Sequence, residues 1–285
     1  MTAPSTVELR RCVLAVSVLY DLDVVASPDG AVVAGQPPVQ LPWAECHQAL
    51  AGASPESALG RDRLARWVGQ RRWLADRSLG DLAERARPVG VPVDSELHPG
   101  ANWVRQRVLG GALDLGIGFV GLDPSRPDDV EVVGPELLAT AEVPAAGWWP
   151  AARHYLDRMG AMAAARFIRD PKAPLRPMGD CDVVTLLGSA AFRTALCANS
   201  QGMCPVAVPM RSRGWLDLSH IDPAFAIAAA AATDPPTRGF VRPLLVTAHE
   251  VTQAPAGGRP AQIALRDRAS GRPGGRPGGR SVLDR

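Results

Sequence analysis

Apolar residues make up 46% of this 285-residue chain, yet its longest unbroken apolar run, residues 224–232, contains only nine of them. A helix that crosses a bilayer needs about 20 consecutive apolar residues, so the sequence predicts no membrane-spanning helix. Short apolar stretches between polar residues are typical instead of helices and strands that bury one face. The length suits one large domain or two modest ones, with a sizeable core in either case.

The basic residues are almost all arginine, 30 of 31, and the only lysine is Lys172. Alanine, glycine, proline and valine are abundant, whereas asparagine and isoleucine are scarce. From this bias we expect a bacterial protein encoded by a GC-rich genome. The 29 acidic residues balance the basic ones to a formal net charge of +2, so the arginine content alone does not indicate a nucleic-acid partner.

Two features bear on the compartment. The apolar stretch 12–20 follows two arginines, as in a secretion signal, but Asp21 and Asp23 stand where the cleavage site would lie. The five cysteines, an odd number without a Cys-x-x-Cys motif, favour neither a disulfide framework nor a zinc site. We therefore expect a cytoplasmic protein with buried thiols.

Residues 1–170 are predicted to form a helix-rich part that contains one β-hairpin. Asp29-Gly30, a favoured turn pair, joins the two valine-rich strands of this hairpin. Residues 12–20 are predicted as a buried strand, with a short helix as the alternative. Apolar residues at helical spacing predict helices over 43–50, 61–76, 78–86, 102–115 and 150–168.

A proline-rich linker, 171–177, is predicted to separate this part from an α/β part over 178–253. There, predicted strands and helices alternate, which is typical of a mostly parallel sheet with helices on its faces. We therefore expect an α/β or α+β fold in which the helix-rich part packs on a mostly parallel βαβαβ-like C-terminal sheet, as one compact unit or two subdomains. The predicted strands are 182–187, 205–210 and 241–248, and the predicted helices are 190–198 and 224–233.

Residues 254–285 contain glycine- and proline-rich repeats with seven arginines and two aspartates, a net charge of +5. A segment of this composition buries almost no apolar surface. We predict a disordered Arg/Gly/Pro tail.

Gly116, Gly118 and Gly121 match the Gly-x-Gly-x-x-Gly pattern of dinucleotide sites. In such a site the glycines join a strand to a helix, whereas here they lie within a predicted strand, residues 116–122. We interpret them as positions of close strand packing.

The first candidate site lies at the ends of predicted strands in the C-terminal part. Gly188 and Ser189 follow strand 182–187, and His249 follows strand 241–248. In a parallel sheet these ends meet at one edge, where helix N-termini favour anions. Gly188 and Ser189 are therefore candidate anion-binding residues, with a tight turn and Ser189 as helix N-cap as the alternative. The candidate catalytic residues are Ser189, His249 and Asp217.

Asp180 and Asp182 precede the first of these strands and are candidate metal ligands, because two carboxylates two residues apart can hold a cation. Such pairs also commonly close turns. The sequence identifies no metal and no cofactor.

The second candidate site is basic and aromatic. Residues 61–77 carry a net charge of +4, and with the predicted helix 78–86 they could form a helix-turn-helix. Pro88 and Pro92 interrupt this pattern, and the alternative is a solvated helix face held by salt bridges. The candidate nucleic-acid-binding residues are Arg61, Arg66, Arg71, Arg72, Trp67 and Trp73.

Three functions are compatible with these patterns. We expect a non-catalytic binding or regulatory protein, because the chain has ample core and no strong catalytic motif. The first alternative is an enzyme that acts on a small anionic or phosphorylated molecule at the edge of the C-terminal sheet. The second is nucleic-acid binding through the 61–77 face or the tail. A small anionic ligand and a nucleic acid both remain open as partners, and the nucleic acid is not favoured.

Overall fold

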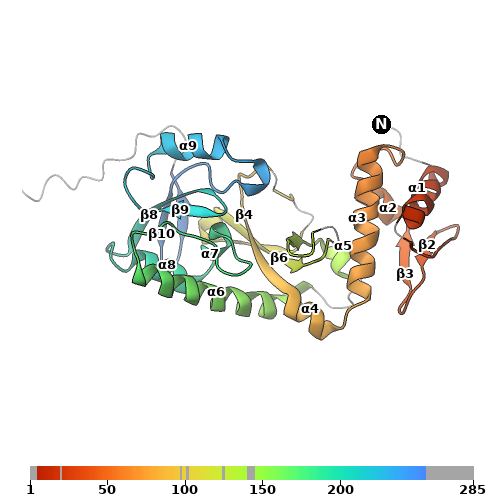
Figure 1. Ribbon diagram of the computed structural model, residues 1–285, viewed down its shortest axis with the longest axis horizontal. Helices are drawn as coiled ribbons and strands as arrows, with labels where there is room; N and C mark the ends of the chain where they lie inside the picture. Colours follow the sequence, from red (N-terminus) through yellow and green to blue (C-terminus); the bar gives the residue numbers. More distant parts are fainter. Residues whose placement is uncertain are drawn as a thin grey trace, which may run out of the picture.

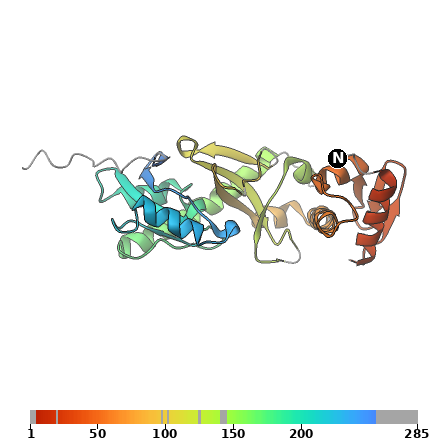
Figure 2. The same ribbon diagram turned by 90° about the horizontal axis from the view of Figure 1, so that it is seen from above.

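The computed structural model describes residues 5–19, 21–96, 98–100, 103–123, 126–139 and 145–254. The described chain forms three antiparallel sheets that follow one another along an elongated molecule (Figure 1). Seen from above, the N-terminal, central and C-terminal parts are three successive masses (Figure 2). Antiparallel sheets with helices packed against them place the fold in the α+β class.

The N-terminal part is a three-stranded sheet in the order β1-β2-β3, packed against three helices. Val24 of β1 pairs with Val33 of β2, which confirms the predicted hairpin around Asp29 and Gly30. The elements are α1 (Thr6–Leu19), β1 (Val24–Ala26), β2 (Gly30–Val33), β3 (Val39–Pro42), α2 (Trp43–Leu50) and α3 (Ala58–Ala75).

The central part is built on the strand order β4-β6-β5, with β7 also paired to β6. The predicted close packing at the glycines of β6 is confirmed. A Cβ on Gly116 would lie 2.1 Å from the Trp103 ring, and one on Gly118 would lie 2.5 Å from the carbonyl oxygen of Glu131. The elements are α4 (Leu79–Arg85), β4 (Ala86–Pro92), β5 (Arg105–Val108), β6 (Leu113–Val120), β7 (Val130–Val132) and α5 (Pro135–Leu138).

The C-terminal part contains a four-stranded sheet in the order β11-β10-β8-β9. In Figure 1, α9 lies on one side of this sheet and α8 on the other, between the sheet and α6. The long helix α6 also contacts β4, so it ties the C-terminal part to the central sheet. The elements are α6 (Trp149–Arg169), α7 (Val183–Leu186), α8 (Ala190–Cys197), β8 (Met203–Met210), β9 (Arg213–Trp215), α9 (Pro223–Ala231), β10 (Leu244–Thr247) and β11 (Val251–Gln253).

The prediction of a mostly parallel βαβαβ-like C-terminal sheet is wrong. β8 pairs antiparallel with β10 and with β9, and β10 pairs antiparallel with β11. Residues 182–187, predicted as the first strand, contain the one-turn helix α7 instead. Asp182 Oδ1 accepts a hydrogen bond from the Thr185 amide at 2.7 Å and thereby starts a helix. Without that strand, the alternation that indicated parallel pairing disappears.

Two predictions nearer the N-terminus are also wrong. The described residues of the predicted helix 102–115 do not form a helix, because Gly110 and Gly111 have φ angles of 64° and 87°. These angles belong to a turn, which here joins β5 to β6. The strand predicted over 12–20 is replaced by α1, as its alternative proposed. The buried residues of α1 recur at helical spacing; they include Leu9, Cys12, Val13 and Val16.

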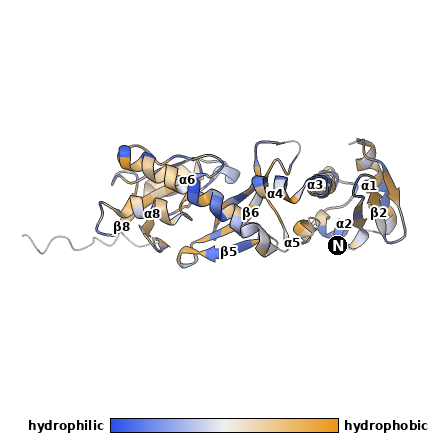
Figure 3. Cartoon of the chain, turned by 90° about the horizontal axis from the view of Figure 1, so that it is seen from below, coloured by the Kyte–Doolittle hydropathy of each residue, from blue (hydrophilic) through white to orange (hydrophobic). Residues whose placement is uncertain are grey.

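Buried apolar side chains gather in two separate cores. The main core, made of buried residues between Trp73 and Val251, spans the central and C-terminal sheets and includes residues on both sides of the predicted linker 171–177. Figure 3 shows hydrophobic residues at both ends of the molecule, around α1 and β2 and around α8 and β8. The division into domains at 171–177 stays a prediction. The N-terminal core consists of Leu9, Cys12, Val13, Val16, Ala31, Val33, Val39, Leu41, Trp43, Cys46, Leu50, Leu64 and Val68.

Two other expectations can be compared with the described residues, and a third cannot. None of their helices has both the length and the apolarity of a membrane span. All five cysteines are buried and free, as predicted. The predicted tail lies outside the described residues from position 255 onward.

The predicted helix 150–168 is confirmed as α6, and Leu156 is 3% exposed in the main core. Leu156→Ala should lower the free energy of unfolding by about 2–5 kcal/mol, because it removes buried methyl groups and leaves a cavity. Urea titration measures this loss. Met162→Ala is the matched control, since Met162 lies on the same helix but is 50% exposed. A loss below about 1 kcal/mol for Leu156→Ala would contradict the packing described here.

Candidate functional site

Ser189 lies inside the protein rather than at the edge of a crevice. It is 1% exposed, and its Oγ accepts a hydrogen bond from the Phe192 amide at 3.4 Å. Gly160 of α6 packs directly on it, because a Cβ at Gly160 would lie 1.9 Å from Ser189 Oγ. The interpretation of Ser189 as the N-cap of α8 is confirmed. Anion binding by Gly188 and Ser189 stays a prediction, now without the parallel sheet on which it was based.

His249 is exposed, in the turn between β10 and β11. The buried Arg193 links this turn to the segment before Ser189. Its Nε donates to the carbonyl of Ala248 at 3.1 Å, and its Nη1 donates to the carbonyl of Leu187 at 2.7 Å. The guanidinium therefore has a structural role between the two segments that carry the predicted residues.

Asp217 belongs to a surface cluster after β9. Its Oδ1 lies 2.6 Å from Nδ1 of His220, whose ring stacks on Trp215. Hydrogen bonds from the Ser219 hydroxyl and from His220 lower the pKa of Asp217 to about 2. None of the contacts between described residues joins Asp217 to Ser189 or His249.

The two candidate metal ligands are each paired with an arginine. Asp180 Oδ2 lies 2.6 Å from Arg87 Nε, and Asp182 Oδ2 lies 2.6 Å from Arg211 Nε. The hydroxyl of Tyr155 also donates to Asp180 at 2.9 Å. Across the described ranges, no group of three or more His, Cys, Asp or Glu side chains is placed to hold a metal ion. The two carboxylates tie the segment before α7 to β4 and to the β8–β9 turn.

The arginines and tryptophans of the predicted basic face are spread around α3. Trp73 is buried in the main core, and Trp67 packs against the N-terminal core. These contacts agree with the alternative of a helix held by salt bridges, and nucleic-acid binding stays a prediction. The arginines contact the following partners: Arg61 the carbonyl of Glu56, Arg66 the carboxylate of Asp123, Arg71 that of Glu45 and Arg72 that of Asp76.

A cleft of about 520 Å³ runs along α3 on the side of the central sheet. Most of its lining residues recur every three or four positions along α3, so they form one stripe of the helix. The loop after α1 and the β6–β7 connection complete the walls. We call this the α3 cleft; it is lined by Leu22, Asp62, Ala65, Arg66, Gly69, Arg72, Trp73, Asp76, Arg77 and Asp123.

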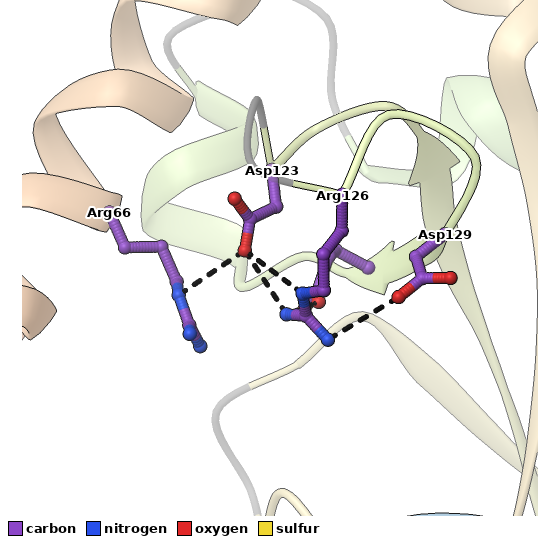
Figure 4. A network of polar contacts seen from close by, with 5 residues as sticks. Arg66, Asp123, Arg126 and Asp129 are labelled. Carbon is purple, nitrogen blue, oxygen red and sulfur yellow. Dashed lines mark hydrogen bonds and ion pairs between the residues drawn. The ribbon is translucent and has the colours of Figure 1, made fainter.

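An ion pair joins the two walls of the α3 cleft. Arg66 Nε lies 3.5 Å from Oδ2 of Asp123, a carboxylate that is almost fully buried. Arg126 holds the same oxygen from the other side, with Nη2 at 3.1 Å and Nε at 3.3 Å, and its Nη1 reaches Asp129 (Figure 4). Asp123 is therefore fixed by the loop of the central sheet and presented to α3.

Arg77, in the short connection between α3 and α4, differs from the other arginines of the cleft. Its guanidinium lies 3.9 Å from the centre of the Trp73 ring, and its Nη1 donates to the Trp73 carbonyl at 2.8 Å. Among the described residues, no carboxylate lies within ion-pair distance of it. Burial lowers the pKa of Arg77, and the neighbouring Arg85 lowers it further.

The sequence drew attention to the stretch of helix that lines the cleft, but as a nucleic-acid-binding face, and it did not indicate the cleft. Leu22 and Asp123 are far from α3 in sequence, and no local pattern connects them. One local signal was present: Gly69 lies inside a predicted helix, where glycine costs about 1 kcal/mol relative to alanine. A glycine inside a helix therefore indicates a packing or functional requirement at that position.

Comparison with known proteins adds no family and no relative: no protein-family model, curated protein or solved structure matches the chain. The residues of the α3 cleft are therefore assigned from their positions and contacts alone.

Asp114 of β6 is fully buried and lies at the centre of a separate cluster of charges in the central sheet, whose other members are partly exposed. His98 Nε2 and Arg105 Nη1 each lie 2.9 Å from its Oδ2, and Arg107 Nε donates to its Oδ1 at 3.0 Å. Burial alone would raise the pKa of Asp114, but the hydrogen bonds from Arg107 and His98 outweigh it and lower the pKa. The ionised carboxylate therefore stabilises the fold.

Asp114→Asn should destabilise the protein at neutral pH by on the order of 3 kcal/mol, because two arginines lose a buried counter-charge. The pKa of Asp114 is lower in the folded state than its ordinary value of 3.8. Its stabilising effect is therefore present above that ordinary value and is lost as the pH falls through the folded-state pKa.

Urea titration at several pH values checks this prediction. The difference in free energy of unfolding between wild type and Asp114→Asn should be present from pH 5 to 7 and shrink below about pH 4. The control is Asp129→Asn, since Asp129 is an exposed end of the Arg126 network. A difference that stays constant down to pH 3 would show that the charge of Asp114 is not the cause.

Proposed function

We propose that this chain is a non-catalytic binding protein whose ligand occupies the α3 cleft. The observation that carries the proposal is the position of the cleft, along α3, a helix that contributes to both cores. Small-molecule sites occur preferentially at junctions of this kind, with volumes of about 300–1,000 Å³. The α3 cleft, at about 520 Å³, is within that range.

The lining of the cleft supports binding of a ligand with an apolar body. Leu22, Ala65 and Trp73 supply apolar surface, and Gly69 has no side chain to fill the space beside the helix. Apolar walls with a few placed polar groups are typical of ligand sites.

Two of the three carboxylates of the lining, those of Asp76 and Asp123, favour binding over proton transfer. Asp76 is paired with Arg72, and Asp123 is held by Arg66 and Arg126. A general base must have a lone pair directed at the substrate, whereas these carboxylates are engaged by guanidinium groups.

A regulatory role is part of the proposal. A ligand in the α3 cleft would lie beside the Arg66–Asp123 pair, which joins α3 to the central sheet. If the ligand binds better to one arrangement of the two walls, it shifts the population toward that arrangement. Binding would then change the relative position of the N-terminal and central parts.

The test compares the wild type with Gly69→Leu, which places a side chain in the cleft. The matched control is Gly80→Leu, a helical glycine of α4 whose added Cβ would meet nothing closer than 3.7 Å. A panel of small alcohols, carboxylates and phosphates is screened by thermal shift. At a ligand concentration of 100 Kd the stabilisation is about 2.7 kcal/mol, a shift of several degrees.

We expect at least one member of the panel to shift the melting temperature of the wild type and of Gly80→Leu, but not that of Gly69→Leu. Equal shifts in all three proteins would place the ligand elsewhere. No shift with any member of the panel would count against a small-molecule site in this cleft.

A further inference from the structure

Arg77 lies at one end of the α3 cleft and is close to a second arginine, Arg85 at the end of α4, which is not part of the lining but acts on Arg77 electrostatically. The carboxylates of Asp76 and Asp81 act on Arg77 only from beyond ion-pair distance. Within the described part of the chain, neither arginine forms an ion pair. Arg85 also approaches the other wall, because a Cβ on Gly121, two residues before Asp123, would lie 3.7 Å from its Nη1.

We propose that the ligand of the α3 cleft is an organic oxyanion, with its carboxylate or phosphate group held by Arg77 and Arg85 and its apolar body lying along α3. This inference rests on the proposed function and names the class of ligand. Two neighbouring guanidinium groups repel each other and are stabilised by an anion placed between them. Arginine is suited to this task because its planar fork matches the oxygens of carboxylate and phosphate.

The stacking of Arg77 on Trp73 prepares the site for such a group. At 3.9 Å from the ring centre, the indole covers one face of the guanidinium and restricts its rotation. The Trp73 carbonyl engages Nη1 and leaves the other N–H donors of the fork for an oxyanion. The partial burial that lowers the pKa of Arg77 also reduces screening by water, so an anion there is bound more strongly than at an exposed arginine.

The acidic residues of the cleft do not cancel this preference. Asp76 and Asp123 are each neutralised by an arginine partner. Asp62 lies fifteen positions before Arg77, which corresponds to roughly 20 Å along a helix. That distance exceeds the Debye length of about 8 Å at physiological salt, so its repulsion at the arginines is small.

The experiment measures binding of phenyl phosphate by isothermal titration calorimetry, with inorganic phosphate, phenol and benzoate as comparison probes. Arg77→Gln and Arg85→Gln each remove one charge, and Arg77→Lys keeps the charge without the planar fork. Arg61→Gln is the matched control, since Arg61 is an exposed arginine of α3 that contacts a carbonyl. The melting temperature of each variant reports whether it is folded.

Phenyl phosphate or benzoate should bind the wild type more tightly than either phosphate or phenol does. Arg77→Gln and Arg85→Gln should weaken this binding by about tenfold or more, which is typical for loss of a charge-assisted hydrogen bond. Arg77→Lys should weaken it less, and Arg61→Gln should leave it unchanged. Whether phenyl phosphate or benzoate binds more tightly assigns the oxyanion, and either order supports the proposal.

Two results separate failure of this inference from failure of the proposed function. In the first result, phenol binds as tightly as phenyl phosphate, the arginine variants leave both affinities unchanged, and Gly69→Leu abolishes the binding of both probes. The cleft is then a binding site, but the assignment of an oxyanion as its ligand is wrong. If Gly69→Leu binds every probe as the wild type does, or no probe binds any protein, both proposals fall. Equal binding of phosphate and phenyl phosphate would show an adventitious ion only and would also overturn the inference.

Discussion

The arrangement of the described chain depends on α3, an 18-residue helix that serves two hydrophobic cores at once. Leu64 and Val68 are buried in the N-terminal core, and Trp73 and Leu74 in the main core. In Figure 1, α3 stands between the first sheet and the rest of the molecule. A hydrogen-bonded helix resists bending, so this one element holds two cores that otherwise share few contacts. The α3 cleft exists because α3 passes from one core to the other without being covered on every side.

The many arginines of this chain act largely as clamps on backbone carbonyls and buried carboxylates. Arg63 reaches the carbonyls of Leu50 and Ala51, and Arg211 reaches that of Gly90. Arg63 thereby joins α3 to the end of α2, and Arg211 joins segments 121 residues apart, which five fixed donors allow. Arginine in place of lysine thus provides a planar, multidentate cation at positions where lysine would make one contact. Arg77 makes a contact of the same kind with the carbonyl of Trp73, but at the wall of the α3 cleft.

Local patterns predicted the elements whose signals are local. α6 has helical periodicity over five turns, and the first hairpin has its Asp-Gly turn, so both were predicted correctly. Residues 183–186 are buried on every side, and a run with no polar face has no period to identify it. The prediction of a parallel sheet depended on a strand at these residues and was wrong without it. The direction of a strand depends on pairing with distant residues, which no short window of sequence contains. The cleft escaped prediction for the same reason: the stretch around Arg66 and Trp73 was recognised as unusual, but its opposite wall is 50 residues away.

The sharing of α3 by two cores sets a limit on how the length of this helix can vary. Each residue of an α-helix adds a rotation of about 100° and a rise of about 1.5 Å. One residue inserted between Val68 and Trp73 would turn the N-terminal sheet by that angle about the helix axis and carry Arg66 away from Asp123. Seven inserted residues would restore the angle but separate the two parts by about 10 Å. The number of residues in this helix therefore sets the angle between the N-terminal sheet and the rest of the molecule. Insertions or deletions can be accommodated only in the loops at its two ends.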